Sequence, residues 1–547
     1  MTDYTLLEMF YSWEAKTPER VFLSQPHEGR YDHYTWHETG NQVRQVAYYL
    51  HSLQLPKNAK IGVFGYTTAH WVMAELAILM AGYIVVPIHY NIPPEDFKHI
   101  VVDSGLSVLF IGKLDIYVKY NKVLPDFVKK ISLPYSNTRD GKRWEEILQE
   151  FTPYSHSVEI NGDKPSYLLY SAGTTGPPKG IIHSMNSLGY ASQQFIEMLG
   201  IRQQARLLSQ LSLTHISTKV LVQIAALYTG STIFFSESKS TLLRDIRFAK
   251  PYFFLSIPHQ WNTLKEMIEA ALIINTSPVF YYIPVFSYFY KRAIRKKLGW
   301  HKSRLFLSSE ESMPDYIQKW YRKTGIKIIE MYGQVENAGY AHINLPSRGR
   351  IGTVGKSVRY SKTMVSKKGA VIMRNEAIML GYHTDHNSYV NPFTKEGFLK
   401  TGDIGELDKR GYLKIIANEK DLIRTNNGKY LAPAQIEKVL IENDLISQVC
   451  LIGNGLGEPL ALIGITSHGK SLSPGNLETI LKGLLSYINS KCKSHQLQSI
   501  VIVPEEWSPE NGLLTPSCKP RRYFIEEYYA PLVPLWLNED KLIVWSC

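Results

Sequence analysis

A loop rich in small polar residues carries the first candidate chemistry of this chain. It follows the apolar run at residues 167–170 and reads SAGTTGPPKG over residues 171–180. Glycines let a phosphate approach the backbone, hydroxyl and amide groups donate hydrogen bonds, and the lysine supplies positive charge. The loop therefore predicts a polyphosphate site, although a lone loop of this composition is more often an exposed surface segment. It does not fit the P-loop pattern GxxxxGK[ST], because two prolines separate Gly176 from Lys179.

Further segments carry candidate residues later in the chain. They are YGQVE at residues 332–336, TGD at 401–403, ANEK at 417–420 and LTPSCK at 514–519. Each segment has an ordinary alternative on its own: TGD can be a turn, Tyr332 a packed ring and Lys519 a solvated lysine. Their joint occurrence, in this order after the glycine-rich loop, argues against all of these alternatives.

The ordered segments resemble the motifs of the adenylate-forming superfamily, which includes acyl-CoA synthetases, luciferases and the adenylation domains of peptide synthetases. The resemblance covers roughly the whole chain. The stretches at residues 36–53, 379–383, 426–437 and 510–516 are most similar to bacterial long-chain fatty acyl-CoA synthetases. The resemblance implies that a fatty acid is activated by ATP as an acyl-AMP and then transferred to CoA.

The resemblance also implies a role for each motif residue. Tyr332 would stack on adenine, and Asp403 would accept hydrogen bonds from the ribose hydroxyls, as acidic residues do in other nucleotide sites. Thr174 and Glu336 would hold Mg²⁺, a hard cation that takes oxygen ligands. Lys519 would bridge the attacking carboxylate and the α-phosphate, since two anions must meet there. The residues implied to bind ATP or AMP are Ser171, Gly173, Thr174, Thr175, Gly176, Lys179, Tyr332, Gly333, Gln334, Asp403 and Asn418.

A second half-reaction needs a different arrangement of the same residues. In the superfamily the small domain rotates about a hinge, which removes the lysine and admits the pantetheine of CoA. Lys420 matches the hinge position, and Gly428 matches a glycine that lets pantetheine pass close to the backbone. His215 matches a position near the acyl group of relatives, while on sequence grounds alone a hydrogen-bonded core histidine is equally consistent.

The elements that must position these residues indicate an α/β protein of two domains. A chain of 547 residues exceeds what one core usually supports. Residues 59–66, 69–82 and 83–90 read as strand, helix and strand of parallel-sheet type, and further strands are expected at 107–113, 165–171 and 230–236. We predict a large AMP-binding domain over 1–416, with parallel sheets flanked by helices, and a small mobile α+β domain over 417–547, with the hinge at 417–420.

The small domain is expected after Asp408, where the sequence becomes polar and rich in turn residues. Strands are predicted at residues 449–453, 460–466 and 500–503, and Ser473-Pro474 is typical of a helix start. The apolar face of that helix is predicted to contain Leu477, Ile480, Leu481, Leu484, Leu485 and Ile488.

Charge and cysteine usage limit the partners. The 61 Lys and Arg against 49 Asp and Glu give a net charge of +12, which suits anionic ligands, nucleic acid or an anionic membrane. We expect no nucleic-acid binding, because no basic motif with interleaved aromatics supports it. The 4 widely separated cysteines indicate a reduced compartment. The first twenty residues lack the pattern of a signal peptide, and the apolar stretch at 71–88 reads as a core helix and strand, so a cytoplasmic protein is expected.

An aromatic run followed by a basic cluster occupies residues 278–304. Such a segment suits the surface of a membrane and predicts peripheral contact at its inner face. A core helix with a solvated basic end is the alternative. The sequence carries no signal for the oligomeric state.

Two places depart from the family pattern. Relatives carry a Gly/Ala-rich loop along the adenine where this chain has SSEESMP at 308–314, so Glu310 and Glu311 would bring two carboxylates near the nucleotide. Relatives also carry arginine two residues before the hinge lysine, where this chain has Asn418. Each departure predicts weaker ATP binding or domain closure. An acyl-adenylate ligase with another thiol acceptor, or a catalytically weakened paralogue that binds acyl chains or nucleotide, therefore stays open beside the CoA ligase.

Overall fold

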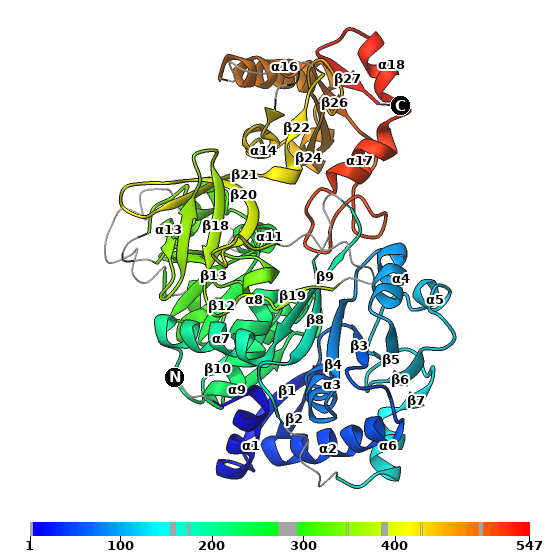
Figure 1. Cartoon of the computed structure of the whole chain (residues 1–547). Helices are drawn as coiled ribbons and strands as arrows, with labels where there is room; N and C mark the ends of the chain where they lie inside the picture. Colours follow the sequence, from blue (N-terminus) through cyan, green and yellow to red (C-terminus); the bar gives the residue numbers. More distant parts are fainter. Residues whose placement is uncertain are drawn as a thin grey trace.

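A large and a small domain make up the chain. The structure, a computed structural model, describes residues 4–153, 160–171, 176–271, 291–292, 294–345, 347, 349–383, 392–426, 428, 430–491 and 496–546. Figure 1 shows the large domain coloured blue to yellow and the small domain coloured yellow to red at one end of it. Strand β21 (Leu413–Asn418) leads into a 3-10 turn over Glu419–Asp421 and then into the small domain. The boundary predicted at 417 stays a prediction.

An eight-stranded sheet crosses the large domain in the order β19-β9-β8-β4-β3-β5-β6-β7. The predicted strand–helix–strand unit is confirmed, because β3 (Lys60–Gly65) and β4 (Ile84–His89) are parallel neighbours joined by α3 (Ala69–Met80). β8 (Pro165–Ser171) and β9 (Lys179–Ser184) pair antiparallel, so this sheet is mixed. The short connection at 172–178 suits an antiparallel pair, whereas a parallel crossover needs a dozen or more residues. The other strands are β5 (Leu106–Ile111), β6 (Lys129–Ser132), β7 (Lys142–Arg143) and β19 (Gly381–Tyr382).

Three further sheets complete the large domain. Their orders are β10-β11-β1-β2, β12-β13-β14-β15-β16 and β17-β18-β20-β21. β13 and β14 are parallel neighbours, so the loops that follow them leave from the same edge. The strands are β1 (Val21–His27), β2 (Arg30–Thr35), β10 (Arg206–Ser209), β11 (Thr232–Phe235), β12 (Phe253–Ser256), β13 (Leu305–Ser308), β14 (Ile328–Tyr332), β15 (His342–Ile343), β16 (Lys356–Ser357), β17 (Lys362–Val365), β18 (Ala370–Arg374) and β20 (Leu399–Leu407).

Helices flank these sheets. Thr5 and Thr35 each begin a helix with a capping box, in which the threonine and a glutamate three residues later satisfy backbone N–H groups. The helices and helical turns are α1 (Leu6–Lys16), α2 (Trp36–Ser52), α4 (Pro94–Asp103), α5 (Val118–Asn121), α6 (Trp144–Glu150), α7 (Met185–Leu199), α8 (Ile216–Thr218), the π-helical turn η1 (Lys219–Ile224), α9 (Ala225–Thr229), α10 (Leu242–Ala249), α11 (Pro258–Ala271), η3 (Trp300–Lys302), α13 (Asp315–Lys323), η4 (Val335–Asn337) and η5 (Glu419–Asp421).

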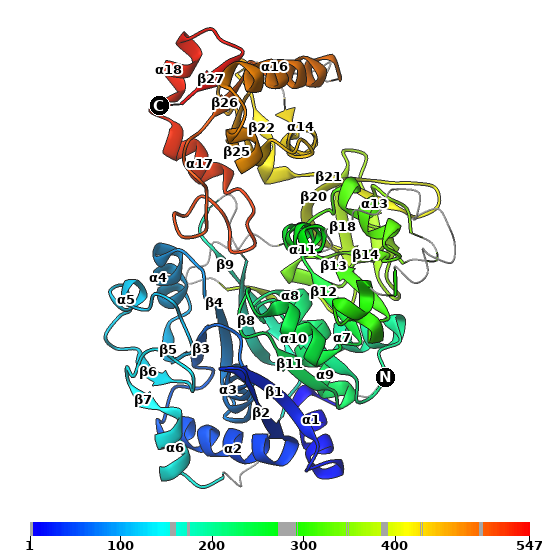
Figure 2. The same cartoon turned by 180° about the vertical axis from the view of Figure 1, so that it is seen from behind.

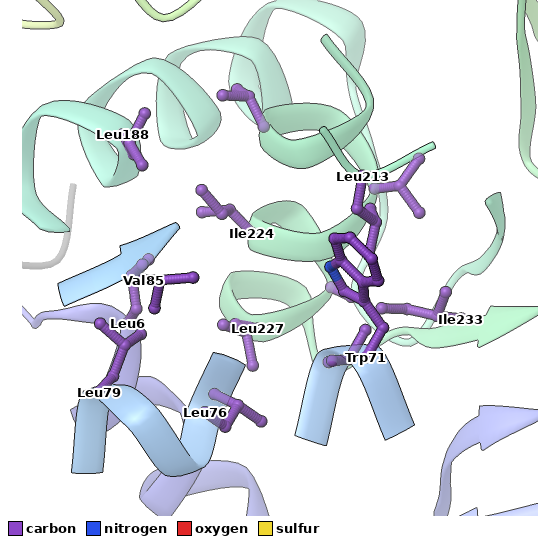
Figure 3. Close-up of a cluster of buried hydrophobic side chains, with 14 of the residues drawn as sticks. Leu6, Trp71, Leu76, Leu79, Val85, Leu188, Leu213, Ile224, Leu227 and Ile233 are labelled. Atoms are coloured by element: carbon purple, nitrogen blue, oxygen red, sulfur yellow. The ribbon is translucent and has the colours of Figure 1, made fainter. Parts of the chain in front are cut away.

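The main core lies around α3, every residue of which is buried. Figure 3 shows Trp71 and Leu76 of this helix together with Ile224 and Leu227 from the helical segment that follows His215. The expected core helix and strand at 71–88 are therefore confirmed. Within the part of the chain that the structure describes, we find no helix with the length and apolar character needed to cross a bilayer.

One fully buried ion pair interrupts this apolar core. Lys219 Nζ lies 2.8 Å from both carboxylate oxygens of Glu75, and neither side chain is exposed. Trp71 Nε1 and Gln223 Nε2 each donate to the same carboxylate over 2.8 Å. A buried charge is tolerated only when it is paired and hydrogen-bonded, and here the partners of Glu75 meet both conditions.

The small domain is built on the sheet β24-β25-β26-β27. Its three predicted strands and its predicted helix are confirmed. Leu477, Leu481, Leu485 and Ile488 of α16 are buried, but Ile480 is 42% exposed, so the apolar face is narrower than the sequence predicts. The elements are β22 (Ile423–Arg424), β23 (Tyr430–Leu431), α14 (Pro433–Ile441), β24 (Ile446–Ile452), β25 (Leu460–Ile465), α15 (Ser467–Lys470), α16 (Pro474–Lys491), β26 (Ser499–Ile502), α17 (Arg522–Tyr529), α18 (Val533–Asn538) and β27 (Ile543–Trp545).

Candidate active site

The predicted site residues come from both domains. Figures 1 and 2 both show the loop that precedes α17 reaching down from the small domain to β9 and α4 of the large domain. That loop carries Lys519. Its neighbour Arg521 forms an ion pair with Asp96 of α4, with Nη2 and Oδ2 3.0 Å apart. The small domain is therefore held over the ends of the strands where the large domain's candidate residues lie.

Asp403 is the centre of one cluster that the sequence predicts. Its Oδ2 accepts hydrogen bonds from the Tyr332 hydroxyl over 2.5 Å and from Gln334 Nε2 over 2.8 Å. Asn418 Nδ2 donates to Oδ1 over 2.9 Å. Burial raises the pKa of Asp403 above its usual value, against the opposing effect of the bonds from Tyr332 and Asn418. The structure thus brings together four residues from three separate motifs.

Gly333 lies between two of these residues and is required by packing. A Cβ atom at this position would lie 2.3 Å from the carbonyl carbon of Gly339. No side chain fits at such a distance from backbone, so the glycine is needed for the turn after β14 whether or not a ligand is bound.

Glu336 and two lysines form a second cluster. The Tyr382 hydroxyl donates to Glu336 Oε1 over 3.0 Å, and burial raises the pKa of this carboxyl. The nearby Lys420 ammonium, together with partial burial, lowers the pKa of Lys179, while Glu336 opposes that shift. The positive charges of Lys179 and Lys420, which belong to separate motifs, therefore lie close together. An anion such as a polyphosphate, bound between them, would relieve their repulsion.

The residues around Glu336 fit a magnesium ion that arrives with a nucleotide. Among the described residues no group of three or more His, Cys, Asp or Glu side chains could hold a metal by itself. Mg²⁺ is commonly bound through one or two carboxylates plus substrate phosphates, so a single buried carboxylate suits it. The second predicted ligand, Thr174, lies outside the described residues, as do Gly173 and Thr175.

The base of the predicted phosphate loop is anchored on both sides. Ser171 ends β8 opposite Lys179, which begins β9. His99 Nε2 donates to the carbonyl of Pro178 over 3.0 Å. Gly176 lies in the described part of the loop, close to these anchors in sequence. The two strands therefore fix where the loop starts and ends.

Lys519 reaches from the small domain to the loop that follows β13 of the large domain. Its Nζ donates to the main-chain carbonyl of Glu310 over 2.6 Å and lies 4.0 Å from Glu311 Oε1. The Glu310 side chain turns toward His215, with Nδ1 and Oε1 2.7 Å apart. The two carboxylates that depart from the family pattern thus face a lysine and a histidine. Sequence reasoning did not find this pairing, because nothing in SSEESMP shows which way its side chains point.

The remaining predictions concern the route of CoA and the membrane. Gly428 has a φ of +73°, a conformation that favours glycine, and among the described residues no heavy atom lies within 4 Å of a Cβ built there. Open space beside this backbone is compatible with a passing pantetheine.

The aromatic part of the stretch at 278–304, residues 278–290, lies outside the described residues.

The fold and the convergence of these motifs define an adenylate-forming enzyme. Residues 10–383 match the family described as AMP-binding enzyme, and the chain belongs to this family.

Relatives match the chain over its whole length. The long-chain-fatty-acid–CoA ligase FadD15 of Mycobacterium bovis is 26% identical over 590 residues, and the match covers 97% of both chains. The long-chain-fatty-acid–CoA ligase ACSBG2 of Rattus norvegicus is 22% identical, with 96% of this chain and 92% of that protein covered.

Two solved structures share the fold. The anthranilate CoA ligase AuaEII in complex with anthranoyl-AMP has a TM-score of 0.77 at 20% identity and covers 97% of this chain and 98% of its own. The o-succinylbenzoate CoA synthetase of Bacillus subtilis, in complex with ATP and magnesium ion, has a TM-score of 0.72 at 20% identity, with 94% and 98% covered.

Proposed function

We propose that this protein is an ATP-dependent fatty acyl-CoA synthetase. Lys519 carries the proposal, because its ammonium lies within the large domain's site and against the Glu310 carbonyl. A mobile lysine from the small domain is what the joining of two anions needs. The names of the relatives make long-chain fatty acids the first substrates to test.

Each residue would then act on one part of the reaction. Lys519 lowers the repulsion between the acyl carboxylate and the α-phosphate as the two approach. Asp403 accepts hydrogen bonds from ribose, in exchange for those it now receives from Tyr332, Gln334 and Asn418. Lys179 binds the outer phosphates. Glu336, with Thr174, would hold Mg²⁺, which when bound neutralises phosphate charge.

The transfer to CoA would use a second orientation of the small domain. We place the domain boundary at 417 and the hinge at Lys420, where β21 passes into the 3-10 turn Glu419–Asp421. Rotation there would withdraw Lys519 and open the space beside Gly428 to pantetheine. Fatty acid, ATP and CoA are thus the proposed substrates, with Mg²⁺ as cofactor.

The proposed location is the cytoplasm, with peripheral contact at the inner face of the membrane. The basic and aromatic stretch at 278–304 supports that contact, since such residues favour the lipid interface.

The decisive experiment is fatty-acid-dependent exchange between ATP and pyrophosphate, run with and without CoA. We expect exchange with long-chain fatty acids, and acyl-CoA and AMP when CoA is added. Exchange without thioester formation across a panel of chain lengths would favour a ligase that uses another thiol acceptor. The absence of exchange with every carboxylate would favour a binding protein descended from an enzyme.

A further inference from the structure

Glu310 contacts both His215 and Lys519, the two basic residues beside the proposed site where the acyl carboxylate is activated. Its carboxylate lies 2.7 Å from His215 Nδ1, and its main-chain carbonyl accepts from Lys519 Nζ over 2.6 Å. The side chains of His215 and Glu310 are only 13% and 16% exposed. Glu310, on the loop after β13, therefore contacts both His215 of the large domain and Lys519 of the small domain.

The pairing fixes the orientation of the imidazole. With Nδ1 bound to Glu310, the ring presents Nε2 on its other side, and no described residue pairs with that nitrogen. A carboxylate on one ring nitrogen commonly orients the ring so that the other can act on a ligand. His215 is the N-terminal cap of α8, whose residues Ile216–Thr218 are buried.

The pairing also sets the charge of the ring. Burial favours neutral imidazole, but the Glu310 carboxylate outweighs it and raises the pKa of His215 above its ordinary value of 6.5. Lys519 opposes this shift, and His89, which lies against the ring at 5.3 Å between centroids, is kept neutral because burial lowers its pKa. The remaining carboxyl at this point is Glu311, which lies nearer to Lys519.

The backbone of the loop is shaped to hold this arrangement. Glu310 has a φ of +74°, in the left-handed region that is costly for a residue with a Cβ. The preceding Ser309 donates from its hydroxyl to Ser217 over 2.9 Å, which ties the loop to the helical segment of His215. A strained residue held in place by the surrounding structure is a common feature of functional sites.

We propose that Glu310 is a positioning residue for activation of the acyl carboxylate. Its side chain holds His215 as an imidazolium whose Nε2–H donates to the substrate carboxylate, and its carbonyl holds Lys519 beside the same carboxylate. This inference rests on the proposed function and adds a second cation to the acyl end of the site. It also assigns the departure at Glu310 to fatty-acid binding, whereas the sequence assigned it to the nucleotide.

The test measures KM for fatty acid as a function of pH in Glu310→Gln, by ATP–pyrophosphate exchange. In the wild type the imidazolium persists until pH rises through the raised pKa. Without the carboxylate, burial and the charge of Lys519 both lower the pKa of His215, so the charge is lost at lower pH. We expect KM for fatty acid to rise roughly tenfold in the variant once the pH exceeds the ordinary imidazole pKa of 6.5 while the wild-type ring is still charged, since hydrogen bonds to charged groups are the strong ones. The ratio of the two KM values should fall toward one at acidic pH, while KM for ATP stays unchanged.

Two further variants keep the test decisive. Glu310→Gly retains the carbonyl that holds Lys519 and relaxes the backbone, so it should fold and show the same pH-dependent ratio. Glu406→Gln removes an exposed carboxylate of β20 and should leave the profile unchanged. A KM for fatty acid that is unchanged or lower in both Glu310 variants would overturn the inference, because Glu310 would then be a bystander or a competitor of the substrate. A wild-type protein with no fatty-acid-dependent exchange would instead reject the proposed function.

Discussion

Lys519 of the small domain donates a 2.6 Å hydrogen bond to the main-chain carbonyl of Glu310 in the large domain. A second contact between the domains joins Lys438 of α14 to Asp315 of α13, with Nζ and Oδ1 3.1 Å apart. The ion pair of Arg521 with Asp96 is a third. Together these contacts hold the small domain in the orientation that we propose for adenylate formation, and the proposed transfer to CoA would have to break them.

The first prediction concerns Lys519. We expect Lys519→Ala to lower the rate of acyl-adenylate formation roughly 10²–10³-fold, as removal of one preorganised charge-stabilising group does elsewhere. Thioester formation from preformed acyl-AMP and CoA should be spared, because no second anion then approaches. Single-turnover measurement of each half-reaction checks this. Equal loss of both half-reactions, in a variant that melts at the wild-type temperature, would contradict the two-orientation mechanism.

The second prediction concerns the hinge. Lys420→Pro should impair thioester formation and largely spare adenylate formation, because proline fixes the backbone angle that the hinge must change. Proline also removes the Lys420 N–H that Asn418 Oδ1 accepts over 3.0 Å. Lys420→Ala is the matched control, since it keeps this N–H and removes only the charge. The hinge assignment is wrong if the alanine variant loses thioester formation as severely as the proline variant.

Much of the fold could be predicted from the sequence because its signals are local. The strand–helix–strand unit at 59–90 follows from apolar patterning and turn residues, and the helix at Ser473-Pro474 from its start signal. The mixed character of the main sheet was missed, because a strand was predicted at 165–171 but none at 179–184, where β9 pairs antiparallel with β8. Ile480 was assigned to the apolar face although it is exposed, since helical periodicity does not show how wide a face the neighbouring sheet covers.

The sequence motifs predict which residues belong to the candidate site, but they do not predict how the side chains contact one another. Tyr332, Gln334 and Asp403 match the family motifs, Asn418 stands where relatives have arginine, and the structure shows that the other three donate to the Asp403 carboxylate. The direction of the Glu310 side chain depends on the positive φ of this residue and on its contact with His215. That histidine lies 95 positions earlier in the chain (310 − 215). Neither is visible in a local pattern.

The third prediction tests the other departure, Asn418. We expect Asn418→Arg to lower KM for ATP about fivefold at saturating fatty acid, because an added positive charge near the phosphates is worth roughly 1 kcal/mol in a partly solvated site. Unchanged turnover would indicate uniform binding, and higher turnover a contact made in the transition state. If KM for ATP stays the same or rises, the amide already serves the site through its 2.9 Å hydrogen bond to Asp403.

The fourth prediction concerns magnesium and pH. Glu336→Gln should raise the Mg²⁺ concentration needed for half-maximal activity at neutral pH, because the ion prefers a charged oxygen ligand. Burial raises the pKa of Glu336, so the wild-type carboxylate is protonated at a higher pH than an ordinary glutamate. The wild-type Mg²⁺ requirement should therefore increase as pH falls toward the raised pKa, while that of the variant stays high and nearly flat. Parallel pH profiles for the two proteins would remove Glu336 from the metal site.

The fifth prediction concerns stability and the buried pair of Glu75 and Lys219. Lys219→Met should destabilise the large domain by roughly 3–5 kcal/mol, because it leaves the Glu75 carboxylate buried without its counter-ion. Adding Glu75→Gln should recover more than half of that loss, since the amide is uncharged and keeps an oxygen for the Trp71 Nε1–H that now donates over 2.8 Å. Thermal unfolding of the two variants, with the exposed Lys409→Met as control for the change of residue type, measures the difference. If the single and double variants unfold at the same temperature, the uncompensated charge is not what destabilises the core, and lost packing around the π-helical turn Lys219–Ile224 is the cause instead.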